Sequence, residues 1–234
     1  MTADTEIQQA STAPEAAPPR RGLRTALLLV MAVALVALGG GGAVVLGIGR
    51  QDPPAANSVD AGFAWDMSRH HLQGVEMANL APGRSQDPVI RSLAFDISAT
   101  QTNQVGRMQG WLSLWGLSNT SSRPPMEWMD GVVSGHSMDG MDMSTPGALM
   151  PGMATEQELD HLRSLSGTAF DVEFLRLMIR HHQGGLKMAQ YAEAHAQLAP
   201  VRLLARSMAE TQTAEVGTMA QLLAERGGTP LPAP

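Results

Sequence analysis

The segment FAWDMSRHHLQGVEMA at residues 63–78 occurs a second time, as FLRLMIRHHQGGLKMA, at residues 174–189. Each copy contains two adjacent histidines, with a methionine three residues before the pair and another six residues after it. When the first copy is turned by 100° per residue, its phenylalanine, methionines and histidines share an arc of about 120°, and Arg69, Gln73 and Glu76 fall outside it. The spacing predicts two matching amphipathic helices whose buried stripes carry the histidine pairs.

The segment after each copy is repeated at the same offset and predicts a further amphipathic helix. Gln101 and Gln104 lie on the otherwise apolar face of the first of these helices, where buried amides need partners such as facing imidazoles. Two such hairpins bury their apolar faces against each other. This predicts an all-α four-helix bundle with an approximate two-fold axis, on which the two histidine pairs approach each other.

Turn and cap residues predict where the helices begin and end. The first helix is expected to end near APGR at residues 81–84, where Pro82 and Gly83 supply the stop signals. Asp87 is the expected N-cap of the second helix, with Pro88 at its first position. The sequence TEQE predicts a capping box at a short later helix, in which Thr155 and Glu158 each bond the other's backbone.

The composition excludes several classes of function. The chain has 234 residues with sixteen methionines, four phenylalanines, four tryptophans and one tyrosine, and a core so poor in aromatic residues suits packed helices. Cysteine is absent, which excludes disulfides, thiolate metal sites, thiol nucleophiles and covalently attached c-type haem. The net charge is −6 without a basic block, so no nucleic-acid partner is expected.

An uncharged run from Thr25 to Gly49 predicts a transmembrane helix. As a helix it would be about 37 Å long, enough to cross a bilayer core of about 30 Å. Arg20, Arg21 and Arg24 precede the run and only Arg50 follows it, which predicts a single-pass protein of the cell membrane with a cytoplasmic N-terminus. The alternative is a cleaved signal peptide, whose apolar region would be shorter and followed by an A-x-A site.

The predicted organisation follows from these signals. We expect a disordered cytoplasmic tail at 1–22, a membrane anchor at 23–49, a linker at 50–58, an extracytoplasmic bundle at 59–228 with a methionine-rich connector at 118–154, and a tail at 229–234.

The histidines and methionines indicate a copper site. Thioether is a soft ligand and imidazole a borderline one, so the two together without cysteine select copper, and Cu(I) most of all. The predicted ligands in the helices are His70, His71, His181, His182, Met67, Met77, Met178, Met188 and Glu215. Met67 and His71 can converge on one ion because they are four residues apart, as can Met178 and His182. Alternatively, one imidazole from each half binds an ion across the axis.

The alternative to metal binding is a structural polar layer. In that interpretation the histidines are neutral and bond to Gln101, Gln104, Gln212 and Glu215, which sets the register of the bundle. Gly74 and Gly185, one helical turn after His70 and His181, lower helix stability and are expected to make room for a ring, an ion or a packed neighbour.

The connector predicts a second, more exposed metal site. His136, Met138, Met141 and Met143 lie within eight residues, among glycines and aspartates that break any helical periodicity. The alternative is that the seven methionines of this connector are adaptable hydrophobic residues that cover the bundle.

Enzyme classes receive less support, and no catalytic residue is predicted. A carboxylate di-metal site requires two Glu-x-x-His motifs, whereas the sequence has one, from Glu158 to His161. No G-x-S-x-G motif occurs, and nothing specific favours a noncovalent haem.

The repeated pattern Phe-x(3)-Met-x(2)-His-His-x(5)-Met-Ala, followed by Gln-x(2)-Glu-x(3)-Met, resembles the domain of unknown function 305 family over about residues 60–228. The resemblance implies a ferritin-like helical bundle in a secreted or anchored bacterial protein, and some members of the family are linked to copper binding and resistance. The residues that match the pattern of the family are Met67, His70, His71, Met77, Gln101 and Met108 in the first half, and Met178, His181, His182, Met188, Gln212, Glu215 and Met219 in the second. Gln104 departs from the pattern, which expects glutamate there.

Together these features predict a membrane-anchored, extracytoplasmic four-helix bundle that binds or buffers copper through histidine and methionine. The alternative is a metal-free structural or partner-binding bundle with hydrogen-bonded core histidines. The sequence identifies no protein partner.

Overall fold

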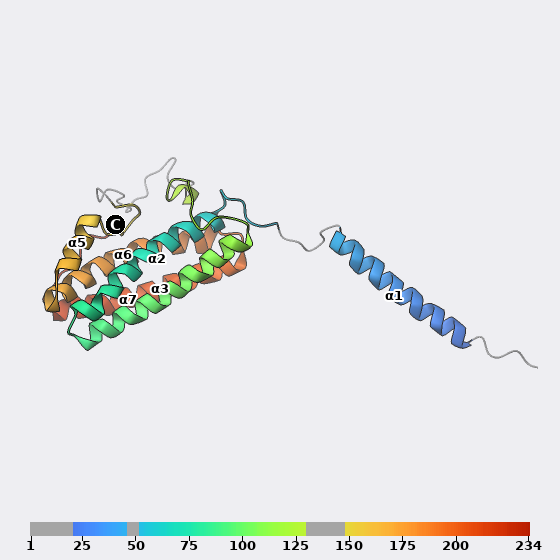
Figure 1. Ribbon diagram of the computed structural model, residues 1–234, viewed down its shortest axis with the longest axis horizontal. Coiled ribbons are helices and arrows are strands. Elements are labelled where there is room, and N and C mark those ends of the chain that lie inside the picture. The colour runs from blue at the N-terminus through green and yellow to red at the C-terminus, as the bar shows by residue number, and fades with distance from the viewer. Residues whose placement is uncertain (1–20, 46–51, 130–147) are drawn as a thin grey trace, which may run out of the picture. The chain divides into compact units, whose positions relative to one another are not determined.

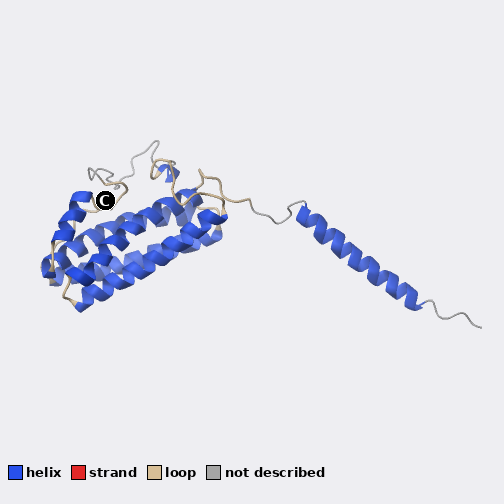
Figure 2. Cartoon of the chain, viewed as in Figure 1, coloured by secondary structure: helices blue, strands red, loops and turns tan. Residues whose placement is uncertain are grey.

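The computed structural model describes residues 21–45, 52–129 and 148–234 (Figure 1). The elements are α1 (Arg21–Val45), α2 (Val59–Arg84), α3 (Pro88–Leu114), η1 (Glu127–Met129), α5 (Glu156–Ser164), α6 (Gly167–His195) and α7 (Ala199–Glu225). These residues include no strand, which confirms the predicted all-α class (Figure 2). The chain divides into two compact units, residues 1–52 and 53–234.

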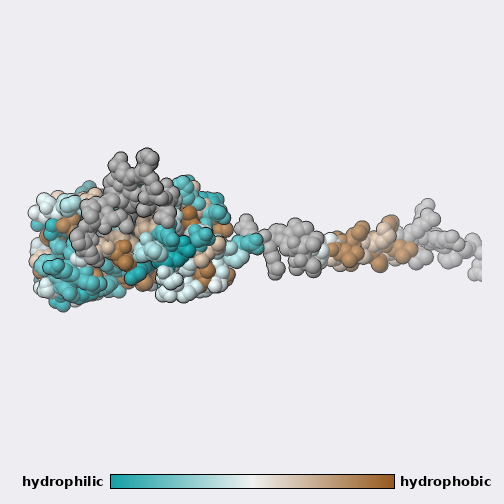
Figure 3. Space-filling model, turned by 90° about the horizontal axis from the view of Figure 1, so that it is seen from above, coloured by the Kyte–Doolittle hydropathy of each residue, from teal (hydrophilic) through white to brown (hydrophobic). Residues whose placement is uncertain are grey.

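Helix α1 is a candidate membrane span. Its segment Thr25–Gly42 is long and apolar enough to cross a bilayer, and none of it is buried. Apolar side chains cover its described surface, whereas hydrophilic and hydrophobic residues are interspersed on the visible face of the second unit (Figure 3). The helix starts at Arg21, two residues before the first residue of the expected anchor, and ends at Val45, four residues before its last residue. Within these bounds it passes through four consecutive glycines, Gly39–Gly42. A secretion signal near the N-terminus can pass the same test of length and composition.

The second unit is a four-helix bundle made of two hairpins (Figure 1). Helices α2 and α3 form the first hairpin and α6 and α7 the second, each joined by a loop of three residues. Helices α2 and α6 pack against each other, while α3 and α7 make few contacts across the bundle. The predicted architecture of two duplicated hairpins is confirmed.

Most predicted helix ends are also confirmed. The Asp87 side chain accepts a hydrogen bond from the Val89 amide at 2.8 Å and caps α3. Thr155 and Glu158 form the expected capping box. The predicted end of the first helix near residues 81–84 is confirmed, because α2 ends at Arg84, with Pro82 inside its last turn. There the missing amide hydrogen removes only one bond of the helix, and the Ser85 amide closes the final turn on the Ala81 carbonyl.

The apolar core consists of two clusters separated by a polar layer. The first cluster includes Phe63, Met67, Met108, Met188 and Met208, and the second includes Met77, Ile97, Phe174, Met178 and Met219. On each long helix the polar residues of the layer lie between members of the two clusters. On α2, for example, His70 and His71 separate Met67 from Met77.

The connector packs into the bundle at both of its described ends. Met126, Met129, Met150 and Met153 are buried members of the first cluster, so these four connector methionines are packing residues. His136, Met138, Met141 and Met143, the predicted second site, lie outside the described residues.

Residues 150–154 lie along α2 and α6. The Gln73 side chain donates to the Ala154 carbonyl at 2.9 Å and accepts from the Ala154 amide at 2.7 Å. Gln73 is therefore buried, which corrects its predicted place outside the buried stripe. Arg180 is also buried and pairs with both carboxylate oxygens of Glu158, at 2.9 and 2.7 Å. These contacts hold α5 and the connector against the central helices.

The close approach of the connector to α6 depends on Gly184, which generates a stability prediction. A Cβ at Gly184 would overlap the Pro151 carbonyl oxygen and lie 2.8 Å from the Gly152 nitrogen, and backbone atoms cannot turn aside. We expect Gly184→Ala to lower the free energy of unfolding by about 1–3 kcal/mol in urea titrations followed by circular dichroism.

Gly217 of α7 is the matched control. Among the described residues, no atom beyond its own helix backbone and chain neighbours lies within 4 Å of the position that a Cβ would take there, so Gly217→Ala should raise the free energy of unfolding by about 1 kcal/mol through helix propensity alone. Equal effects of the two substitutions would contradict the packing of residues 150–154 on α6.

Candidate metal centre

The four histidines of the repeated motif form the middle of the polar layer. His70 and His71 on α2 and His181 and His182 on α6 are all fully buried, at 0% exposure. The ring centroids of His70 and His181 are 3.8 Å apart, across the contact between the two hairpins. The predicted approach of the two histidine pairs is therefore confirmed.

Two glycines give these rings their space. A Cβ on Gly74 would overlap the Gln101 Oε1 atom and lie 2.9 Å from Cε1 of His181. In the other half, a Cβ on Gly185 would lie 2.9 Å from Gln212 Nε2 and 3.2 Å from Cε1 of His70. The expectation that these glycines make room for a ring or a packed neighbour is confirmed, and the room serves both an imidazole and a glutamine.

Two of the imidazoles bond to backbone carbonyls. Nε2 of His181 donates to the His70 carbonyl at 2.8 Å, and Nε2 of His70 donates to the Pro151 carbonyl at 3.1 Å. A carbonyl oxygen only accepts hydrogen bonds, so the proton of each neutral ring is assigned to Nε2. The symmetrical partner of His70 would be the His181 carbonyl, and the connector takes its place.

The other two imidazoles bond to side chains of the outer helices. Nε2 of His71 lies 2.7 Å from Oε1 of Gln104 on α3, and Nε2 of His182 lies 2.7 Å from Oε2 of Glu215 on α7. Both acceptors are oxygens, so Nε2 carries the proton in these rings as well. Glu215, predicted as a ligand, is thus placed as the hydrogen-bond acceptor of a histidine.

In these four histidine rings, the other nitrogen, Nδ1, has no hydrogen-bond partner among the described residues. The Nδ1 atoms of all four histidines are buried and make no hydrogen bond among the described residues, and neither do the side-chain amides of Gln101 and Gln212. The structural alternative expected these two glutamines to bond the histidines, and only Gln104 and Glu215 do so. With Nε2 protonated, each Nδ1 carries a free lone pair.

The surroundings keep three of these rings uncharged. Burial, opposed in part by the hydrogen bond to Pro151, lowers the pKa of His70 to about 4. Burial, together with the nearby His70, lowers the pKa of His71 to about 3, and burial and His70 also hold the pKa of His181 well below its ordinary value. These three imidazoles are therefore neutral at pH 7, the state in which a histidine binds a metal.

The donor set around the layer fits a soft ion. No group of three or more histidine, aspartate or glutamate side chains in the described parts of the chain is arranged to hold a metal ion. Met67, Met77, Met178 and Met188 are fully buried in the clusters on the two sides of the layer. Imidazole with thioether is a donor set for Cu(I).

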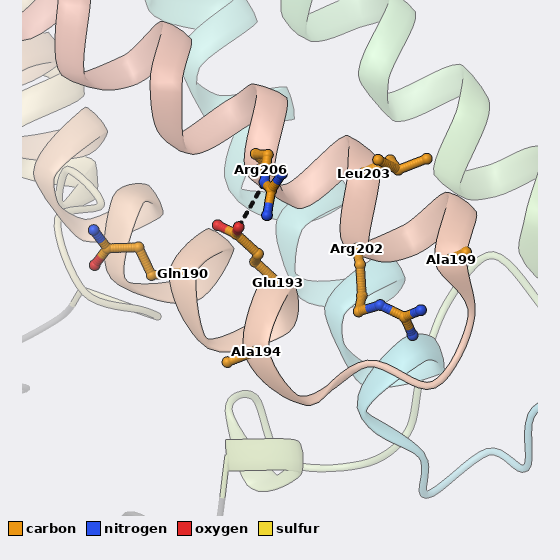
Figure 4. A pocket seen from close by; sticks show the side chains of 7 residues that line it. All are labelled: Gln190, Glu193, Ala194, Ala199, Arg202, Leu203 and Arg206. Atoms are coloured by element: carbon orange, nitrogen blue, oxygen red, sulfur yellow. Dashed lines mark hydrogen bonds and ion pairs between the residues drawn. The ribbon is translucent and has the colours of Figure 1, made fainter.

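The layer reaches the surface between α3 and α7. A small pocket of about 10 Å³ is lined there by Ile97, Thr100, Gln101, Gln104, Met208, Thr211, Gln212 and Glu215. A larger surface pocket of about 520 Å³ lies elsewhere, where α6 ends and α7 begins (Figure 4). Arg206 and Glu193, which line this pocket, form an ion pair with Nε and Oε1 2.7 Å apart, and none of the residues that line the pocket is a predicted ligand.

The family model described as domain of unknown function (DUF305) matches residues 60–223. The chain belongs to this family. A comparison with curated proteins gives no match.

Three solved structures are similar to this chain. A DUF305 protein from Streptomyces coelicolor, described as a candidate secreted protein, is 45% identical, with 76% of this chain and 99% of that chain covered and a TM-score of 0.66. A DUF305 fragment from Deinococcus radiodurans is 34% identical, with coverage of 74% and 99% and a TM-score of 0.57. CopM in its Cu(II)-bound form is 27% identical, with coverage of 72% and 97% and a TM-score of 0.50.

The buried neutral histidines predict how the stability of the metal-free DUF305 domain depends on pH. Their pKa values are lower in the folded than in the unfolded state, so the unfolded chain binds more protons below about pH 6.5. Stability is fully present above that pH and falls as the pH drops, by up to about 1.4 kcal/mol per pH unit for each such histidine.

We expect urea titrations between pH 7 and 5 to show this loss, and His71→Gln to make the slope shallower because it removes one such group. A free energy of unfolding that stays constant over this range would contradict neutral, buried histidines.

Proposed function

We propose that this protein binds copper, chiefly as Cu(I), in the polar layer of its bundle and thereby buffers the ion outside the cytoplasm. The observation that carries the proposal is the set of four buried Nδ1 atoms without partners, each in a ring whose Nε2 proton bonds an oxygen. Histidines that bind metals are oriented in this way, with the other ring nitrogen donating to a carbonyl or carboxylate.

The methionine clusters divide the proposed site into two half-sites. We define the glutamine half-site as His71, Met67 and Gln104, and the glutamate half-site as His182, Met178 and Glu215. Met188 belongs to the same apolar cluster as Met67, and Met77 to the same cluster as Met178. His70 and His181 lie between the half-sites and offer two further Nδ1 atoms.

The resemblance to CopM supports the choice of metal. CopM has been solved with Cu(II) bound, it shares 27% identity with this chain, and 97% of its chain is covered. The bound ion would act as a Lewis acid and accept electron pairs from its ligands. The residues of the protein would orient the imidazoles and exclude water.

A metal-free structural layer is the competing function, and the hydrogen bond that each Nε2 makes is the observation in its favour. The number of buried polar groups without a hydrogen-bond partner argues against this function. A buried polar atom without a partner costs about 1–3 kcal/mol, and this layer leaves four Nδ1 atoms and two amides in that state. A layer that served stability alone would gain from apolar side chains of similar volume.

The proposed location is the cell membrane. Helix α1 would be a single-pass anchor, with the cluster Arg20, Arg21 and Arg24 on the cytoplasmic side and the bundle outside. The connector residues His136, Met138, Met141 and Met143 would form a second, more exposed copper site.

Titration with Cu(I) held in a competing chelator tests the proposal, with Zn(II) and Fe(II) measured in parallel. We expect tight, copper-selective binding. The double variant His71→Ala, His182→Ala should lose at least about tenfold in affinity, because each half-site loses an imidazole.

The matched control is His161→Ala, His195→Ala, which removes two exposed histidines and should leave the affinity unchanged. Circular dichroism checks that both variants keep their helices. Binding that survives unchanged in the first double variant would show that His71 and His182 do not hold the copper, and binding no tighter than the chelator would refute copper binding altogether.

A further inference from the structure

The two halves of the polar layer differ in one hydrogen-bond acceptor. His71 and His182 occupy equivalent positions, and each bonds an oxygen at 2.7 Å on a residue 33 positions further along the chain. In the first half that residue is Gln104, a neutral amide that is 8% exposed. In the second half it is Glu215, a carboxylate with 22% of its side chain exposed.

The remaining residues of the pocket between α3 and α7 are closely matched. Thr100 and Gln101 of α3 correspond to Thr211 and Gln212 of α7. Ile97 corresponds to Met208, and both are buried apolar residues. The carboxylate is therefore the one charged group that distinguishes the two halves within this pocket.

This difference changes the imidazole as a ligand. A hydrogen bond to a carboxylate is roughly twice as strong as one to a neutral amide. It also raises the basicity of the opposite ring nitrogen and holds the ring in one orientation. Nδ1 of His182 is thus the better electron-pair donor of the two.

We propose that the two half-sites bind copper with unequal affinity and that Glu215 makes the glutamate half-site the tighter one. The inference rests on the proposed function. Glu215 is a positioning residue in this account, because it acts through His182 and does not touch the ion. The layer then fills in a fixed order, with the glutamate half-site loaded first.

The test uses the full chain in detergent with His136→Ala, Met138→Leu, Met141→Leu and Met143→Leu, so that the connector does not bind the ion. Cu(I) is titrated against a competing chelator. We expect two binding steps that differ by about tenfold or more.

Two isosteric substitutions isolate the acceptor, since Ile97 and Met208 are kept in both. Glu215→Gln should weaken the tighter step until the two steps coincide. Gln104→Glu should strengthen the weaker step by about tenfold or more. A gain of affinity is the decisive readout, because a residue that merely supports the fold gives a loss when it is replaced.

The outcomes separate the inference from the function it rests on. Two equal steps in the parent protein, or two steps that neither substitution shifts, would overturn the inequality of the half-sites and leave copper binding in place. Binding no tighter than the chelator in the parent protein would overturn both. Thermal melts by circular dichroism confirm that each variant is folded at the temperature of the titration.

Discussion

The hydrogen bond from Nε2 of His181 to the carbonyl of His70 joins the two hairpins at the centre of the bundle. It lies within the contact between α2 and α6, where the centroids of the two tilted rings are 3.8 Å apart. Helix pairs packed on apolar residues alone tolerate shifts along their axes, whereas a buried donor and acceptor tolerate one register. The position of α6 on α2, and with it the level at which Gln104 and Glu215 meet the other rings, depends on this bond.

The sequence predicts the parts of this arrangement that repeat. The 100° spacing of Met67, His70 and His71 predicts their shared buried face, and the second copy predicts the two-fold relation that brings the histidines together. The role of Gly74 and Gly185 can be predicted as well, because a glycine inside a helix is unfavourable and is expected where close packing requires it. Caps such as Asp87 are predictable because they act within one turn of the chain.

The parts that do not repeat could not be predicted. The connector has no second copy, so nothing in the sequence indicates that Pro151 accepts the bond from His70 or that Ala154 takes both bonds of Gln73. Gln101 and Gln104 lie on the same face of α3 and have the same chemistry. Only the three-dimensional position of each amide relative to His71 decides that Gln104 is the partner and that Gln101 packs against Gly74.

The narrowness of the pocket between α3 and α7 has a consequence for rates. Residues 150–154 close the layer on the side of α2 and α6, and the pocket on the other side, about 10 Å³, has room for about one water molecule. An ion with any of its hydration shell is too large to pass it. If an ion binds the buried imidazoles as proposed, its exchange would require α3 and α7 to separate, on the microsecond-to-millisecond timescale of collective helix motions. The lifetime of such an ion would then follow the opening of the bundle, and not diffusion to its surface.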